Sequence, residues 1–110
     1  MTEKQIQNAV LREFGTRPDC RLWRANVGVA RIGGPGSAGG RVVCFGVPGQ
    51  ADLSGILPGG LRLEIEVKRP GCPQTPEQKA FQRMIERFGG VYVLARSVQD
   101  VWSAIGEYLS

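Results

Sequence analysis

The sequence predicts a single α/β domain over residues 1–110, with helices flanking a central mixed sheet in the order α-β-β-β-β-α-β-α. Three observations support this fold class. Apolar residues recur at helical spacing in three segments, over residues 3–14, 76–88 and 98–109. Apolar and charged residues alternate over residues 61–68, as in a strand with two unlike faces. A continuous apolar run at 91–95 is typical of a strand covered on both faces.

The first two helices begin with the same local signal. Thr2 and Gln5 form a predicted capping box, and Gly15 ends the first helix. In the second helix Thr75 is the predicted N-cap, followed by proline at the first helical position and Gln78 at the third. Both starts are therefore fixed by short-range hydrogen bonds.

The strands before the second helix are predicted at 21–27, 41–45, around residue 52 and at 61–68. Residues 58–60, Pro-Gly-Gly, are turn chemistry that folds the last two of these strands back on each other. The stretch GGPGSAGG at 33–40 cannot pack and is predicted to be a mobile connection. A mostly antiparallel meander followed by one right-handed crossover is expected.

The composition of the chain limits the kinds of active site and the partners that it can have. The chain has no histidine, which excludes Ser-His-Asp and Cys-His catalysis and the usual zinc hydrolase sites. Its net charge of +4 favours polyanionic partners. Cys20, Cys44 and Cys72 are widely spaced and indicate neither a disulfide framework nor a zinc knuckle. With no apolar span or leader in the sequence, a cytoplasmic protein without a membrane partner is expected.

Asp52, Glu66 and Lys68 form the candidate catalytic group. Magnesium-type ions take oxygen ligands from one or two carboxylates, which Asp52 and Glu66 would supply, and the backbone carbonyl of Val67 would add a third oxygen. Lys68 shares a strand face with Glu66 and is placed to orient or deprotonate an attacking water, or to neutralise charge on a phosphate. The alternative is that Glu66 and Lys68 are only a charge pair on a solvated strand.

Three segments together resemble a known family: GVPGQADLSGIL, LEIEVK and QTPEQKAFQRMIERFGGVYVL, within a similarity running from about Glu3 to Val98. They are similar to the virus-type replication-repair nuclease (VRR-NUC) domain, a branch of the PD-(D/E)xK nuclease superfamily. The resemblance implies a restriction-endonuclease-like core. It also assigns Asp52 and Glu66 as metal-binding carboxylates and Lys68 as the catalytic lysine. Ala51 stands where the superfamily pattern has proline, a variation familiar in this branch.

The resemblance adds two further site residues. Gln78 matches the family's glutamine on the helix after the core strand, where it would support the lysine or the attacking water. Glu3 matches the acid on the first helix that reaches the same site in many members. Helix capping explains Gln78 without catalysis, and the helix dipole explains Glu3 equally well.

Several other side chains keep two interpretations. Glu64 either reaches the edge of the site or faces solvent, and Arg24 and Asn26 either contact phosphate or line a solvated edge. Trp23 and Trp102 are interpreted as core or dimer contacts rather than base-stacking platforms. Three cations at helical spacing serve either solubility or phosphate binding: Lys79, Arg83 and Arg87.

The resemblance implies a Mg²⁺- or Mn²⁺-dependent DNA endonuclease without an organic cofactor. Family members of this minimal size resemble junction-resolving enzymes that act as homodimers on branched DNA, which suits a symmetric four-way junction. Three alternatives stay open: a flap or other repair nuclease of the same fold, a non-catalytic nucleic-acid-binding module, and a phosphoryl-transfer or small-molecule hydrolase.

Overall fold

The computed structural model describes residues 1–25, 28–33 and 40–109, with the backbone only for residues 28–31 and 43–45. Most of the predicted connection at 33–40 lies outside the described residues. None of the helices in the described part of the chain is long and apolar enough to cross a membrane.

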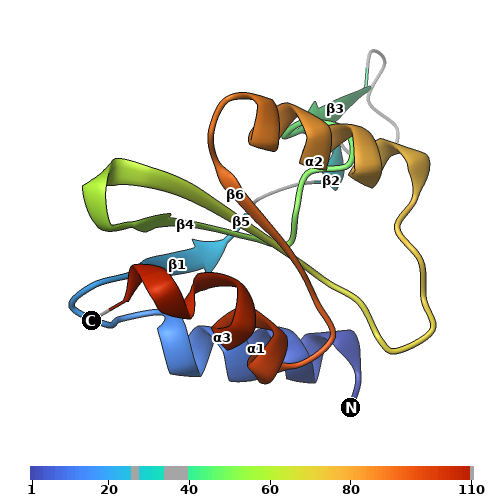
Figure 1. Ribbon diagram of the computed structural model, residues 1–110. Coiled ribbons are helices and arrows are strands. Elements are labelled where there is room, and N and C mark those ends of the chain that lie inside the picture. The colour runs from blue at the N-terminus through green and yellow to red at the C-terminus, as the bar shows by residue number, and fades with distance from the viewer. Residues whose placement is uncertain (26–27, 34–39, 110) are drawn as a thin grey trace.

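A four-stranded mixed sheet forms the centre of the structure (Figure 1). Its spatial order is β1 (Arg21–Arg24), β4 (Leu53–Leu57), β5 (Leu61–Val67) and β6 (Val91–Ala95). The first three strands pair antiparallel, and β6 runs parallel to β5 after the crossover through α2. The predicted α/β class, with a mixed sheet and flanking helices, is confirmed.

A separate antiparallel hairpin is made by β2 (Gly28–Ile32) and β3 (Arg41–Phe45). Five strands therefore precede α2 in the described chain, where the sequence predicts four. The predicted strand at 21–27 ends at Arg24, because β1 pairs with β4 in the main sheet whereas β2 pairs only with β3. The predicted strand at 21–27 is therefore not one continuous strand that belongs to both sheets.

The helices cover the two faces of the sheet unequally (Figure 1). α1 (Glu3–Phe14) and α3 (Val98–Ile105) pack on one face, where they bury the main apolar core with the inward residues of all four strands. α2 (Pro76–Arg87) lies on the opposite face and packs against β6, with a smaller core around Phe81, Ile85 and Tyr92. This second face is the one that carries the alternating charged residues of β5.

The predicted helix starts are observed. Thr2 with Gln5, and Thr75 with Gln78, each form a complete capping box, so both helices begin where the sequence predicts. Ser97 caps α3 by accepting a hydrogen bond from the Asp100 N–H.

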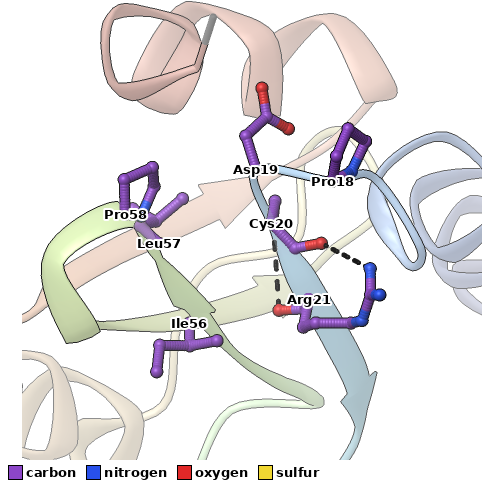
Figure 2. Close-up of a pocket in the computed structure, with 7 residues that line it drawn as sticks. All are labelled: Pro18, Asp19, Cys20, Arg21, Ile56, Leu57 and Pro58. Atoms are coloured by element: carbon purple, nitrogen blue, oxygen red, sulfur yellow. Dashed lines mark hydrogen bonds between the residues drawn. The ribbon is translucent and has the colours of Figure 1, made fainter.

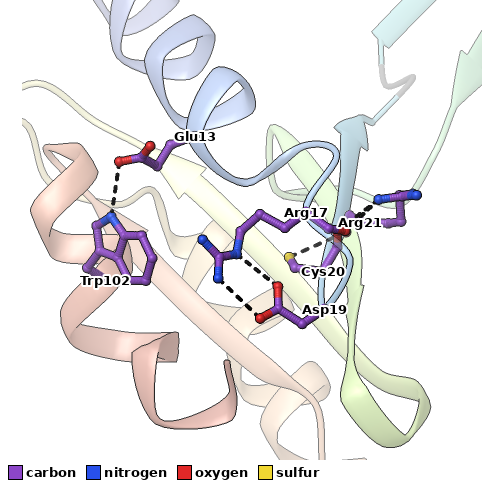
Figure 3. Close-up of polar contacts among 6 residues, drawn as sticks. All are labelled: Glu13, Arg17, Asp19, Cys20, Arg21 and Trp102. Atoms are coloured by element: carbon purple, nitrogen blue, oxygen red, sulfur yellow. Dashed lines mark hydrogen bonds and ion pairs between the residues drawn. The ribbon is translucent and has the colours of Figure 1, made fainter. Parts of the chain in front are cut away.

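The end of α1 is fixed against α3 by aromatic and polar contacts (Figure 3). Trp102 packs on Phe14 with ring centroids 4.8 Å apart, and its Nε1–H donates to Glu13 at 3.3 Å. Arg17 lies over the Trp102 ring at 5.2 Å and forms a bidentate ion pair with Asp19. Trp102 is thus a core and helix-packing residue, one of the two roles that the sequence predicts for it.

The bend before Asp52 packs directly against the start of α2. Pro48 and Gly49 form the middle of a turn in which the Gln50 N–H donates to the Val47 carbonyl at 2.9 Å. Gly49 has φ +76°, and a Cβ built there would lie 2.1 Å from the Glu77 carbonyl oxygen. Only glycine permits both this backbone conformation and this contact.

Gly49→Ala is therefore expected to lower the free energy of unfolding more than Gly59→Ala. Both glycines have positive φ, which costs an alanine about 1–2 kcal/mol, but a Cβ at Gly59 meets nothing within 4 Å. Chemical denaturation of the two variants measures the difference. Equal losses would contradict the packing of this bend against α2.

Candidate active site

The pairing of β4 with β5 brings Asp52 and Glu66 together. The antiparallel register ends at Leu53 opposite Ile65, so the next residues, Asp52 and Glu66, face each other. The Asp52 Oδ2 accepts a hydrogen bond from the Val67 N–H at 2.9 Å, and the Asp52 carbonyl accepts one from Ala25 at 2.9 Å. Asp52 is thereby held between its two neighbouring strands.

Glu66 is buried, with 3% of its surface exposed. Its Oε2 accepts a hydrogen bond from the Gln78 Nε2 at 3.1 Å. Its Oε1 is also buried and has no hydrogen-bond partner in the described part of the chain. A buried carboxylate oxygen without a donor is costly and is rare in folded proteins, so it indicates a place for a proton or a cation.

The surroundings of Glu66 raise its pKa to about 8. Burial is the largest cause, since it disfavours the charged form, and the negative charge of Asp52 is the next. When Glu66 is protonated its proton can be shared with the Asp52 carboxylate, which also raises the pKa, as does the charge of Glu3, whereas Lys68 lowers the pKa. The acids around Glu66 thus bring more negative charge to this place than the positive charge of Lys68 balances.

Val67 directs both of its backbone polar groups toward Asp52. The Val67 N–H donates to Asp52, and the N–H of the following peptide, at Lys68, donates to the Ala95 carbonyl on the other side of β5 at 3.0 Å. N–H and C=O point in opposite directions in a trans peptide, and the described chain has no cis peptide. The Val67 carbonyl therefore points toward β4 and the Asp52 side.

Lys68 and Glu3 lie at the margin of the site formed by Asp52, Glu66 and Val67. Lys68 is half-buried, directly follows β5, and has no carboxylate within ion-pair distance among the described residues. Glu3 is the first residue of α1, is half-buried, and acts on Glu66 only through its charge. No group of three or more Asp, Glu, Cys or His side chains is gathered as a metal site in the described residues.

Gln78 forms the predicted helix cap and also reaches the candidate site, where its amide contacts Glu66 rather than Lys68. Its Oε1 accepts from the Thr75 N–H at 2.8 Å, which closes the capping box, while its Nε2 donates to Glu66. Because the cap requires the oxygen to face Thr75, the amide nitrogen is left to face the carboxylate. The start of α2 is thus hydrogen-bonded to Glu66, which together with Asp52 forms what we call the acid pair.

The donor set fits a hard divalent cation. Asp52, Glu66 and the Val67 carbonyl offer oxygen atoms near one end of the β4–β5 pair, and the Glu66 Oε1 has no partner in the described part of the chain. Magnesium is commonly held by only one or two carboxylates with water and substrate phosphate, so a cluster of three acids is not required.

Glu64 does not face solvent, contrary to one of its two predicted roles. Its side chain is completely buried, where it accepts from the Ser54 hydroxyl at 2.6 Å and from the Arg62 guanidinium at 2.9 Å. The charged face of β5 is therefore buried at Glu64 and Glu66, whereas Arg62 on the same face is exposed. Ser54, which sequence reasoning missed, is opposite Glu64 in the register and could have been found from that pairing.

Tyr92 and Gln74 extend the polar network beside Glu64 and were also missed. Tyr92 is opposite Glu64 on β6, and its hydroxyl accepts from the Gln74 Nε2 at 3.2 Å. Burial raises the pKa of Tyr92 to about 12, and the charges of the nearby acids add to the effect. The phenol therefore stays protonated at neutral pH.

Arg24 and Trp23, on β1, each kept two interpretations from the sequence. Arg24 donates to the side chains of Gln7 and Asn8 on α1 and so serves to join β1 to that helix. Trp23 is not a core residue, because 52% of its surface is exposed. Asn26 lies outside the described residues.

The cavities found in the described part of the chain do not include the acid pair, and one of about 460 Å³ lies between α1 and the start of α3. A second, of about 400 Å³, is lined by Pro18 to Arg21 and by Ile56 to Pro58, at the far end of β1 and β4 (Figure 2). Another of about 350 Å³ lies between α2 and the bend before Asp52, with Arg62 in its wall. None of these is lined by Asp52 or Glu66.

No protein-family model matches the chain, and no curated protein is significantly similar to it. The nuclease resemblance thus remains a prediction from the three motif segments.

The raised pKa of Glu66 makes stability depend on pH. Since the folded pKa of about 8 exceeds the ordinary value of 4.5, the folded chain holds a proton that the unfolded chain has released between these values. This stabilisation is complete below pH 4.5 and is lost as the pH rises through 8. In EDTA, the free energy of unfolding should fall over this window.

Glu66→Gln should remove this fall, whereas Glu77→Gln, an exposed acid in the first turn of α2, should keep it. Denaturant titrations across the window measure both. A fall that persists in Glu66→Gln would show that another group is responsible.

Proposed function

We propose that the chain is a metal-dependent DNA endonuclease with a restriction-endonuclease-like core. The single observation that carries the proposal is the buried Oε1 of Glu66 beside Asp52, which has no hydrogen-bond partner among the described residues, with Lys68 close enough to act on Glu66 through its charge. The element order, with antiparallel strands followed by a helical crossover to a parallel strand, is consistent with that core.

Asp52, Glu66 and the Val67 carbonyl would hold the Mg²⁺ or Mn²⁺ ion. When bound there, the ion supplies Lewis-acid chemistry, polarising a phosphate and easing deprotonation of water. Gln78 keeps the Glu66 carboxylate turned so that Oε1 stays available. Glu3 adds negative charge to the group and so favours a cation in it.

Lys68 is the only side chain in this group that brings positive charge to the acids. Its ammonium would orient or deprotonate the attacking water, or balance the negative charge that develops on the phosphate oxygens during attack. Because it is not in an ion pair within the described residues, the ammonium is free to meet the substrate.

DNA is proposed as the partner because the chain is basic and because α2, which begins at the site, carries three exposed cations at helical spacing: Lys79, Arg83 and Arg87. A homodimer acting on branched DNA in the cytoplasm follows from the family resemblance. Cleavage of a flap, or binding without cleavage, are the competing outcomes.

Lys68→Ala should reduce cleavage of DNA by roughly 10²–10³-fold while leaving divalent-ion binding nearly intact, because Lys68 acts on charge that develops in the reaction. The assay compares labelled four-way junction, flap, single-stranded and duplex DNA with Mg²⁺ or Mn²⁺, and calorimetry measures ion binding. Asp52→Ala should lose both activity and ion binding. If the wild type cuts none of these DNAs with either ion, the nuclease proposal is wrong.

Gln78→Ala should lower cleavage by roughly 10–100-fold, because the amide orients a metal-ligating carboxylate. Gln5→Ala is the matched control, since Gln5 closes the same type of capping box on α1 without reaching the acids. Gln78→Ala should lose more stability than Gln5→Ala, because it also removes a hydrogen bond to the buried Glu66, and only Gln78→Ala should lose activity. Equal activities in the two would reduce Gln78 to a helix cap.

A further inference from the structure

The sheet face that carries the acid pair continues as three rows of residues across β1, β4 and β5. Direct cross-strand partners point to the same face, and successive rows on that face are about 7 Å apart. The first row is Ala25, Asp52 and Glu66; the second is Trp23, Ser54 and Glu64; the third is Arg21, Ile56 and Arg62. Trp23 is thus the diagonal neighbour of Asp52.

The rows are open on the β1 side. α2 packs on β6, and the side chains nearest to it on this face, at Glu64 and Glu66, are buried. Toward the edge strand, Trp23 is 52% exposed and Ile56 is 43% exposed. An indole that lies half in solvent, one row from half-buried Asp52 and buried Glu66, is not explained by packing in the core.

Positive charge borders the indole on the side away from the acids. The Arg62 side chain is 58% exposed, and one of its nitrogens is held by Glu64. The Arg21 guanidinium is fixed by hydrogen bonds to the carbonyls of Arg17 and Cys20. The two arginines are the cross-strand neighbours of Ile56, but the Arg21 guanidinium points away from Ile56 toward the Cys20 carbonyl (Figure 2), whereas that of Arg62 points to Glu64.

We propose that Trp23 is a stacking platform for an unpaired nucleobase of the DNA strand that enters the site. The scissile phosphate would lie at the first row, and the neighbouring base would lie on the indole in the second. The order of acid pair and aromatic side chain is that of a phosphate and its neighbouring base along a single strand. The inference rests on the proposed function for the direction of the strand, but the stacking itself does not require cleavage.

The test is binding of a thymidine oligonucleotide of about 15 residues to the full chain in EDTA, followed by tryptophan emission and anisotropy. Wild type should show quenching of emission. Trp23→Ala should bind roughly 10-fold more weakly, with an unchanged dependence on salt, because a stacking contact is lost and no phosphate contact. Trp23→Phe should recover most of the affinity.

Tyr108→Ala is the control, because Tyr108 is an exposed aromatic that follows α3 on the other side of the sheet. It should bind as wild type does. Unchanged affinity and no loss of quenching in Trp23→Ala would overturn the proposal. So would a Trp23→Ala variant that binds DNA normally but changes from dimer to monomer in sedimentation, since the face would then be a protein interface.

The two proposals fail separately. If the wild type cuts DNA but Trp23→Ala binds normally, only the stacking platform is wrong. If the wild type cuts no DNA but Trp23 emission is quenched and Trp23→Ala binds weakly, the platform stands and the chain is a binding module. Absence of oligonucleotide binding by the wild type overturns the platform.

Discussion

The register between β4 and β5 is the constraint on which the candidate site depends. Because side chains alternate with a period of two, a slip of one residue would turn Asp52 away from Glu66 and move Glu64 to the opposite face. Three features oppose such a slip: the turn at Pro58–Gly60, the Ser54–Glu64 hydrogen bond, and the bond from the Val67 N–H to Asp52. Two of these three use the charged residues themselves.

The burial of this charged face has a cost that its hydrogen bonds only partly offset. A buried carboxylate is tolerated when its oxygens are paired, as they are at Glu64. Glu66 differs, because one oxygen is bonded to Gln78 and the other has no partner among the residues that the structure describes. Groups that retain such an uncompensated position are found preferentially at functional sites, since a sheet used only as scaffold gains stability from an apolar residue there.

Much of this arrangement could be predicted from local sequence rules. Alternation over residues 61–68 and the Pro-Gly-Gly turn were enough to bring Asp52 and Glu66 together, and the Thr75 cap placed Gln78 on the first turn of α2. Alternation states which residues share a face but not whether another element covers that face. The burial of Glu64 and the exposure of Trp23 depend on where α2 crosses the sheet, which no local pattern contains. The separate β2–β3 hairpin was missed for the same reason, because it depends on which strands pair.

The acid pair lies at the border of the sheet area that α2 covers, and this position explains how one site meets two opposing requirements. Charge–charge interactions are strong only where water is excluded, which favours a buried Glu66 under α2. A polymer substrate needs an open surface, which the β1 side of the same face provides. Exposure accordingly increases along the sheet, from buried Glu66 through half-buried Asp52 to exposed Trp23. A helix lying across all four strands would also bury the acids, but it would block the approach of the substrate. If no helix covered this face, the acids would be in water, where their effect on a cation or a phosphate is weak.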